Sequence, residues 1–146
     1  MLRRRMMLAE QEKWELLAEI ALTEETAVST FTLTPAKTGF KKYKIIGDGI
    51  ALDKNGQFWL FLKQDLTQIT LFSYGKNTDG SFEIFIEESE ERIHFYGIST
   101  GQDSWMSEVN TTFDDYQKVD LEDMYFVFKA PSSNIVSGNI KIYGTN

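Results

Sequence analysis

The chain has 146 residues, of which 42% are hydrophobic and 25% charged, as expected for one globular domain and not for a disordered chain. Its net charge of -7 disfavours nucleic acid as a partner, because phosphate contacts require clustered Lys and Arg side chains. There is no cysteine, which excludes disulfide scaffolds, thiolate metal sites and cysteine nucleophiles together.

Residues 1–13 differ in character from the rest of the chain. They consist of good helix formers without Gly or Pro, and they predict a short N-terminal arm or helix that needs a docking surface. A frayed tail and an arm that joins a neighbouring subunit are the two alternatives. Polar residues from Glu10 onward interrupt the apolar stretch, so we expect no signal peptide, no membrane insertion and synthesis in the cytoplasm.

From Trp14 onward the hydrophobic pattern has the period of two that is typical of strands. Residues 14–22 predict the first strand, with Trp14 and Leu16 on its apolar face. Residues 27–34 predict the second. A third strand around Tyr43 and Ile45 is expected to end at the glycines of residues 47–49.

The segment QFWLFLKQDLTQITLFSY, residues 57–74, predicts the central hairpin of the fold. Its first strand carries apolar residues on both faces, with Phe58 and Leu60 on one and Trp59 and Phe61 on the other. Residues 63–65 predict the turn. A strand with two apolar faces is expected to lie inside a sheet, with both faces covered.

Four further strands are expected in the second half of the chain, and residues 97–117 and 132–139 are expected to be loops. Eight to ten short strands with regularly spaced turns, and no helical segment between them, predict an all-β fold. We expect an antiparallel β-sandwich of jelly-roll type. Residues 14–146 would form this single domain, preceded by the arm of residues 1–13.

No catalytic motif occurs in the chain, so we expect no enzymatic activity and no cofactor. His94, the one histidine, lies inside a predicted strand without a Ser or Cys motif, which favours a structural role. Carboxylates between Asp114 and Asp123 lack the spacing of a calcium loop, and no metal site is assigned, although calcium binding there is left open.

Aromatic residues suggest two kinds of binding surface. Trp105 lies in the longest predicted loop and, with Tyr96 and Tyr116, is a candidate platform for sugar rings; the alternative is that Trp105 caps the core. The second faces of the strands carry more aromatic residues than a solvated surface needs, which predicts a homo-oligomer. The interface candidates are Leu2, Met6, Leu8, Trp59 and Phe72.

The opening MLRRRMM, followed by WELLAEIALTEETAVSTFTL, and the ending IVSGNIKIYGTN resemble small β-sandwich structural proteins from the tail or baseplate regions of prophages of Gram-positive bacteria. The resemblance implies a jelly-roll fold, a place in the virion tail beside other tail proteins, and attachment to a cell-surface polysaccharide of the host. It makes a trimer the first expectation and a dimer the second. The alternative function is a carbohydrate-binding module of a cellular protein.

Overall fold

A computed structural model describes residues 13–54, 56–62, 68–74, 79–89, 92–100, 106–113, 125–131 and 133–146. One short 3-10 turn, η1, spans Glu24–Thr26. The strands are β1 Glu15–Leu22, β2 Thr30–Leu33, β3 Lys42–Leu52, β4 Gly56–Leu62, β5 Gln68–Tyr74, β6 Asp79–Ser89, β7 Arg92–Thr100, β8 Met106–Phe113, β9 Phe126–Lys129 and β10 Ile135–Thr145.

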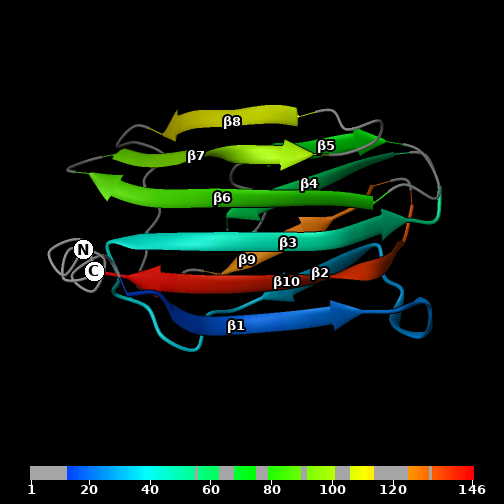
Figure 1. Ribbon diagram of the computed structural model, residues 1–146, viewed down its shortest axis with the longest axis horizontal. Coiled ribbons are helices and arrows are strands. Elements are labelled where there is room, and N and C mark those ends of the chain that lie inside the picture. Colours follow the sequence, from blue (N-terminus) through cyan, green and yellow to red (C-terminus); the bar gives the residue numbers. More distant parts are fainter. Residues whose placement is uncertain are drawn as a thin grey trace, which may run out of the picture.

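The strands form two antiparallel sheets that pack face to face (Figure 1). One sheet has six strands in the order β1-β10-β3-β6-β7-β8, and the other has four in the order β2-β9-β4-β5. Early strands therefore pair with late ones: β1 with β10, β2 with β9, β3 with β6, and β4 with β5. This nested pairing is that of a long hairpin rolled into two sheets, which is the jelly roll, and β7 and β8 extend it beside β6. The predicted antiparallel β-sandwich is confirmed, whereas residues 1–12 of the predicted N-terminal arm lie outside the described residues.

Three phenylalanines join the two sheets across the core. The ring of Phe82, from the six-stranded sheet, lies 6.0 Å from the ring of Phe58 and 6.4 Å from that of Phe128. Phe58 and Leu60 of β4 are 0% exposed, and β4 lies between β9 and β5. β4 is thus interior to its sheet, as its two apolar faces predicted, whereas β5, the second strand of the predicted hairpin, lies at the edge of that sheet.

The first strand differs from its prediction in which residues face the core. A β-bulge between Leu16 and Ala18 changes the alternation, so Leu17 is buried and Leu16 is 46% exposed. One extra residue in a strand moves the following side chains to the opposite face. Trp14 and Leu16 accordingly lie outside the core.

Three predicted loop boundaries were wrong. β3 continues through Gly47 and Gly49 to Leu52, with a register shift against β6 between Gly47 and Ile50. Residues 97–117, expected to be a loop, include the end of β7 and all of β8, which is the polar edge strand of the six-stranded sheet. β10 begins at Ile135, inside the predicted loop of residues 132–139. Polar edge strands and glycine-containing bulges lack the apolar alternation from which strands are predicted.

Candidate functional site

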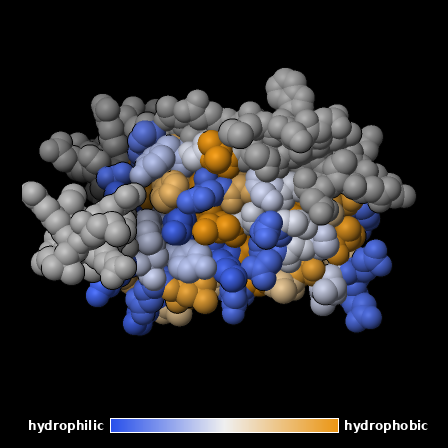
Figure 2. Space-filling view, in the orientation of Figure 1, coloured by the Kyte–Doolittle hydropathy of each residue, from blue (hydrophilic) through white to orange (hydrophobic). Residues whose placement is uncertain are grey.

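Side chains from successive strands form one line across the outer face of the six-stranded sheet. Each member of this line pairs with the next one in the strand register. The order across the sheet is Leu16, Tyr143, Lys44, Phe85 and Tyr96. Their chain neighbours Ile45, Ile84 and Phe95 are buried, so this line points away from the core. We call Tyr143, Lys44, Phe85 and Tyr96 the aromatic row. Figure 2 shows this outer face, with apolar side chains lying between polar ones across its middle.

Ring stacking links the β6 and β7 members of the aromatic row. The rings of Phe85 and Tyr96 are stacked, with centroids 5.3 Å apart and planes inclined by 14°. His94 lies on the next outward position of β7, with its ring centroid 5.3 Å from that of Tyr96. The Tyr96 hydroxyl donates a hydrogen bond of 3.4 Å to Glu87 Oε2. These contacts hold the rings upright on the sheet, with one face of Phe85 against one face of Tyr96.

Lys44 connects the aromatic row to the start of the chain that the structure describes. Its ammonium nitrogen lies 4.4 Å from the ring centroid of Trp14 and 5.1 Å from that of Tyr143, both within the range of cation–π attraction. Trp14 also lies against Phe85, with ring centroids 6.0 Å apart. The residue that follows the N-terminal arm is therefore anchored on the outer face of the six-stranded sheet.

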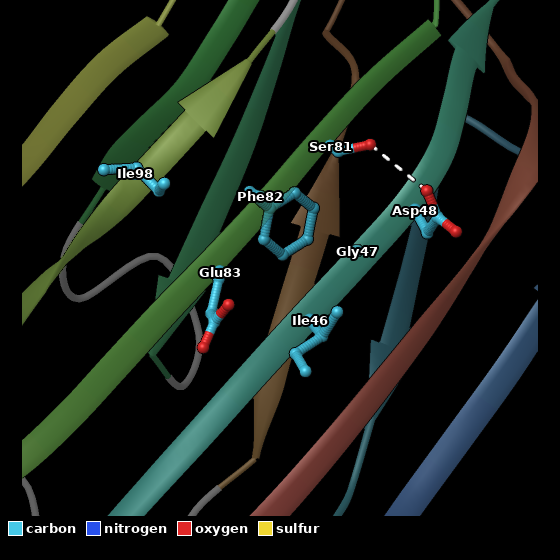
Figure 3. Close-up of a pocket in the computed structure, with 7 residues that line it drawn as sticks. All are labelled: Ile46, Gly47, Asp48, Ser81, Phe82, Glu83 and Ile98. Atoms are coloured by element: carbon cyan, nitrogen blue, oxygen red, sulfur yellow. Dashed lines mark hydrogen bonds between the residues drawn. The ribbon is translucent and has the colours of Figure 1, made fainter.

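A shallow pocket lies one step along the strands from the aromatic row (Figure 3). Its volume is about 280 Å³, and it is lined by Ile46, Gly47, Asp48, Ser81, Phe82, Glu83 and Ile98. Ile98, on β7, is 47% exposed. The pocket thus combines apolar walls with two carboxylates and one hydroxyl, a lining suited to a ligand that has both apolar and polar parts.

Backbone irregularity in β3 shapes this pocket. Gly47 lies opposite Phe82 in the β3–β6 register, and a Cβ atom at Gly47 would lie 2.1 Å from Phe82 Cε1. Beyond Gly47 the register shifts, and Asp48 turns toward β6, where its Oδ1 accepts a hydrogen bond of 3.2 Å from Ser81 Oγ. The Asp48 carboxylate is therefore oriented at the rim before any ligand arrives.

The outer face of the four-stranded sheet carries a smaller aromatic group. Trp59 of β4 is half-buried, and its Nε1 donates a hydrogen bond of 2.8 Å to Gln57 Oε1. The ring of Phe61 meets that of Trp59 edge to face at 6.1 Å and is only 5% exposed. Among the described residues, Trp59 is thus the more accessible member of this pair.

The structure places two of the predicted binding residues on opposite sides of the sandwich. Tyr96 belongs to the six-stranded sheet and Trp59 to the four-stranded sheet, so they do not form one site. Phe72 lies in β5 opposite Phe58, and the structure describes its backbone only. The remaining candidates lie outside the described residues: Trp105, Tyr116, Leu2, Met6 and Leu8.

Sequence reasoning missed several residues of this face. Trp14 was assigned to the core side of its strand, and Lys44, Asp48 and Ile98 were not singled out. Lys44 alternates with the buried Tyr43 and Ile45, so its outward position was readable from the pattern. Its place beside Phe85 was not, because that depends on which strands pair.

No family model matches the chain, and a search of curated proteins also finds no match. Among the described residues, no three His, Cys, Asp or Glu side chains lie close enough together to hold a metal ion. Within the same part of the chain, no helix has the length and apolar character to cross a membrane.

Proposed function

We propose that the protein is a non-enzymatic structural or receptor-binding protein of a phage tail, and that it acts by association through the outer face of its six-stranded sheet. The phage setting comes from the resemblance of the two ends of the chain to tail proteins. The association surface comes from the geometry of the outer face.

The observation that carries the proposal is the aromatic row, flanked on the same face by two exposed aliphatic residues. Leu16 and Ile98 are 46% and 47% exposed, and Phe85, Tyr96 and Tyr143 are half-buried. Interfaces between proteins are enriched in aromatic residues and carry polar groups around an apolar centre. A sheet face with this mixture loses apolar contact with water when a partner covers it.

A charged substitution on this face tests the proposal. Ile98→Lys should lower the molar mass of the full chain in light scattering at high micromolar concentration, because it places an ammonium group in an apolar contact. Thr32→Lys is the matched control, since Thr32 is exposed on the outer side of the four-stranded sheet. Equal masses for the parent and both variants would contradict association through this face.

Attachment to a host-surface glycan is part of the same proposal, and Tyr96 is the described residue that supports it. Its hydroxyl and the Glu87 carboxylate place polar groups beside a half-exposed ring, a combination that suits the polar and apolar sides of a sugar. On an array of cell-wall glycans, Tyr96→Ala should reduce the signal of the full chain, and Trp59→Ala should leave it unchanged. An undiminished signal for Tyr96→Ala would remove Tyr96 from glycan binding.

A carbohydrate-binding module of a cellular protein is the second candidate, favoured by the same Tyr96 and Glu87 arrangement. The two candidate functions predict different oligomeric states. A module of a cellular protein should bind glycan while the chain remains monomeric, whereas a tail protein should associate with its own copies.

A further inference from the structure

The pocket beside the aromatic row has the chemistry of a site for a cation on an apolar stem. Asp48 on β3 and Glu83 on β6 lie on opposite sides of the Phe82 ring (Figure 3). In the strand register Glu83 lies between Ile46 and Ile98, which form the apolar walls. An arginine side chain matches this lining, because its methylene stem packs on apolar surface while its guanidinium pairs with carboxylates. The volume of about 280 Å³ is below that of most drug-sized ligand sites and suits one long side chain.

The N-terminal arm supplies such side chains. Three of the four arginines in the sequence are Arg3, Arg4 and Arg5, and apolar residues flank them at Leu2 and Met6. The rest of the chain is strongly acidic, so the arm and the pocket are complementary in charge. The arm ends beside Trp14, which is anchored on Phe85 and Lys44 on the same face as the pocket.

The length of the arm is sufficient for a contact with another copy. The eleven residues from Arg3 to Lys13 span about 36 Å when extended and about 17 Å as a helix, and either length exceeds the width of a few strands. Because each copy has one arm and one pocket, an arm that enters a neighbour's pocket makes a head-to-tail contact. Such contacts repeat around a ring or along a fibre.

We propose that the pocket of Ile46, Asp48, Ser81, Glu83 and Ile98 binds an arginine side chain from the N-terminal arm of a second copy of this chain. The inference rests on the proposed function, because it names the contact by which copies of an assembled tail protein would join. It also gives Leu16 and Ile98 a partner, since the arriving copy covers the face on which both are exposed.

A double-mutant cycle on the full chain tests the contact. One variant carries Arg3→Gln, Arg4→Gln and Arg5→Gln; a second carries Asp48→Asn and Glu83→Gln; a third combines all five. Each of the first two should weaken association about tenfold in sedimentation equilibrium, since a hydrogen bond to a charged group contributes on that scale. The combined variant should associate no more weakly than the weaker of the first two variants, because each of them already removes the contact. Glu24→Gln with Glu25→Gln, on exposed η1, is the control and should change nothing.

Charge reversal separates a contact between copies from one within a copy. A chain with Arg3→Glu, Arg4→Glu and Arg5→Glu, and a chain with Asp48→Lys and Glu83→Lys, should each be monomeric. Mixed in equal amounts they should associate, because each arm then matches the pocket of the other chain. Every matched contact joins one chain of each kind, so the mixed assembly should contain the two chains in equal number and an even number of copies, even where the parent chain forms a ring of three.

Three results would overturn the inference. Unchanged dissociation constants in the glutamine variants would show that the charges do not meet. Additive losses in the combined variant would show that arm and pocket act separately. A mixture of the reversed chains that stays monomeric would exclude exchange between copies. In each case, continued association of the parent chain would leave the proposed function standing, whereas a monomeric parent would remove both.

Discussion

Phe85 of β6 and Tyr96 of β7 lie directly opposite each other in the strand register, and their rings stack with centroids 5.3 Å apart. Such cross-strand aromatic pairs contribute to stability beyond the area that they bury. The pair thus serves the sheet as well as any partner that contacts the outer face. Effects of substitutions there on binding must be separated from effects on folding.

We predict a coupling energy of about 0.5–1.5 kcal/mol between Phe85 and Tyr96 in the free energy of unfolding. The cycle compares Phe85→Leu, Tyr96→Leu and the double variant by chemical denaturation. Phe85 with Trp59, from the other sheet, is the control pair and should show no coupling. Equal coupling in both pairs would mean that the stacking contact has no energetic role.

A large loss of stability is expected when Leu60, a core residue of β4, is truncated. Leu60→Ala should lower the free energy of unfolding by about 2–5 kcal/mol, because Leu60 is 0% exposed and its removal leaves a cavity between the sheets. Leu16→Ala, at a half-exposed position, should cost well under about 1 kcal/mol. A melting temperature of Leu60→Ala close to that of the parent would show that β4 is not central to the core.

Gly47 is expected to tolerate no side chain while Phe82 remains. Gly47→Ala should destabilise the protein by about 1–3 kcal/mol, because the added methyl group would overlap the Phe82 ring. Combination with Phe82→Leu should cost less than the sum of the two single changes, since the ring is the obstacle. At Gly97 an added Cβ would lie 2.0 Å from the backbone oxygen of Glu83. No substitution of a side chain removes this oxygen, so the cost of Gly97→Ala should not be reduced by a second substitution. Additive costs of the two changes at Gly47 and Phe82 would contradict the overlap.

Asp53 predicts loss of stability in acid. The backbone N–H of Asn134 donates a hydrogen bond of 2.8 Å to its carboxylate and holds its pKa below the usual value of 3.8, with further help from the Asn134 side chain and Lys54. The pKa of Asp53 is lower in the folded chain than in the unfolded chain. The ionised carboxylate therefore contributes its full stabilisation at pH values above the unfolded-state pKa, and this stabilisation is lost as pH falls through the folded-state pKa. Asp53→Asn should therefore destabilise the protein near neutral pH by well under about 1 kcal/mol, because solvent screens this exposed carboxylate, and the difference should shrink as pH falls below 3.8. Parallel stability curves for the parent and the variant across this range would contradict the assignment.

The sequence predicted the strands whose side chains alternate cleanly and the fold that they form. Phe58 and Leu60 were assigned to the core from their run of apolar residues, and both are buried. The errors fall where alternation fails for a local reason: the bulge after Leu16, the glycines of β3 and the polar edge strand β8. Each of these depends on pairing between distant segments, which no local pattern reports.

The candidate site was predictable only in part for the same reason. A surplus of aromatic residues on the second strand faces was predicted, but the alignment of Phe85 and Tyr143 with Lys44 and Tyr96 follows from the order β10-β3-β6-β7. The pocket depends on the register shift beyond Gly47, which brings Asp48 to Ser81. Neither arrangement leaves a signal in the spacing of residues along the chain.

Sedimentation of the unaltered full chain, from low to high micromolar concentration, tests most directly whether the outer face of the six-stranded sheet serves association. We predict a mass that rises with concentration to a whole multiple of 16.8 kDa, with three copies the first expectation. We also predict that the Ile98→Lys variant stays at the lower mass under the same conditions. A single species of 16.8 kDa over the whole range, at low and at moderate salt, would contradict association through this face.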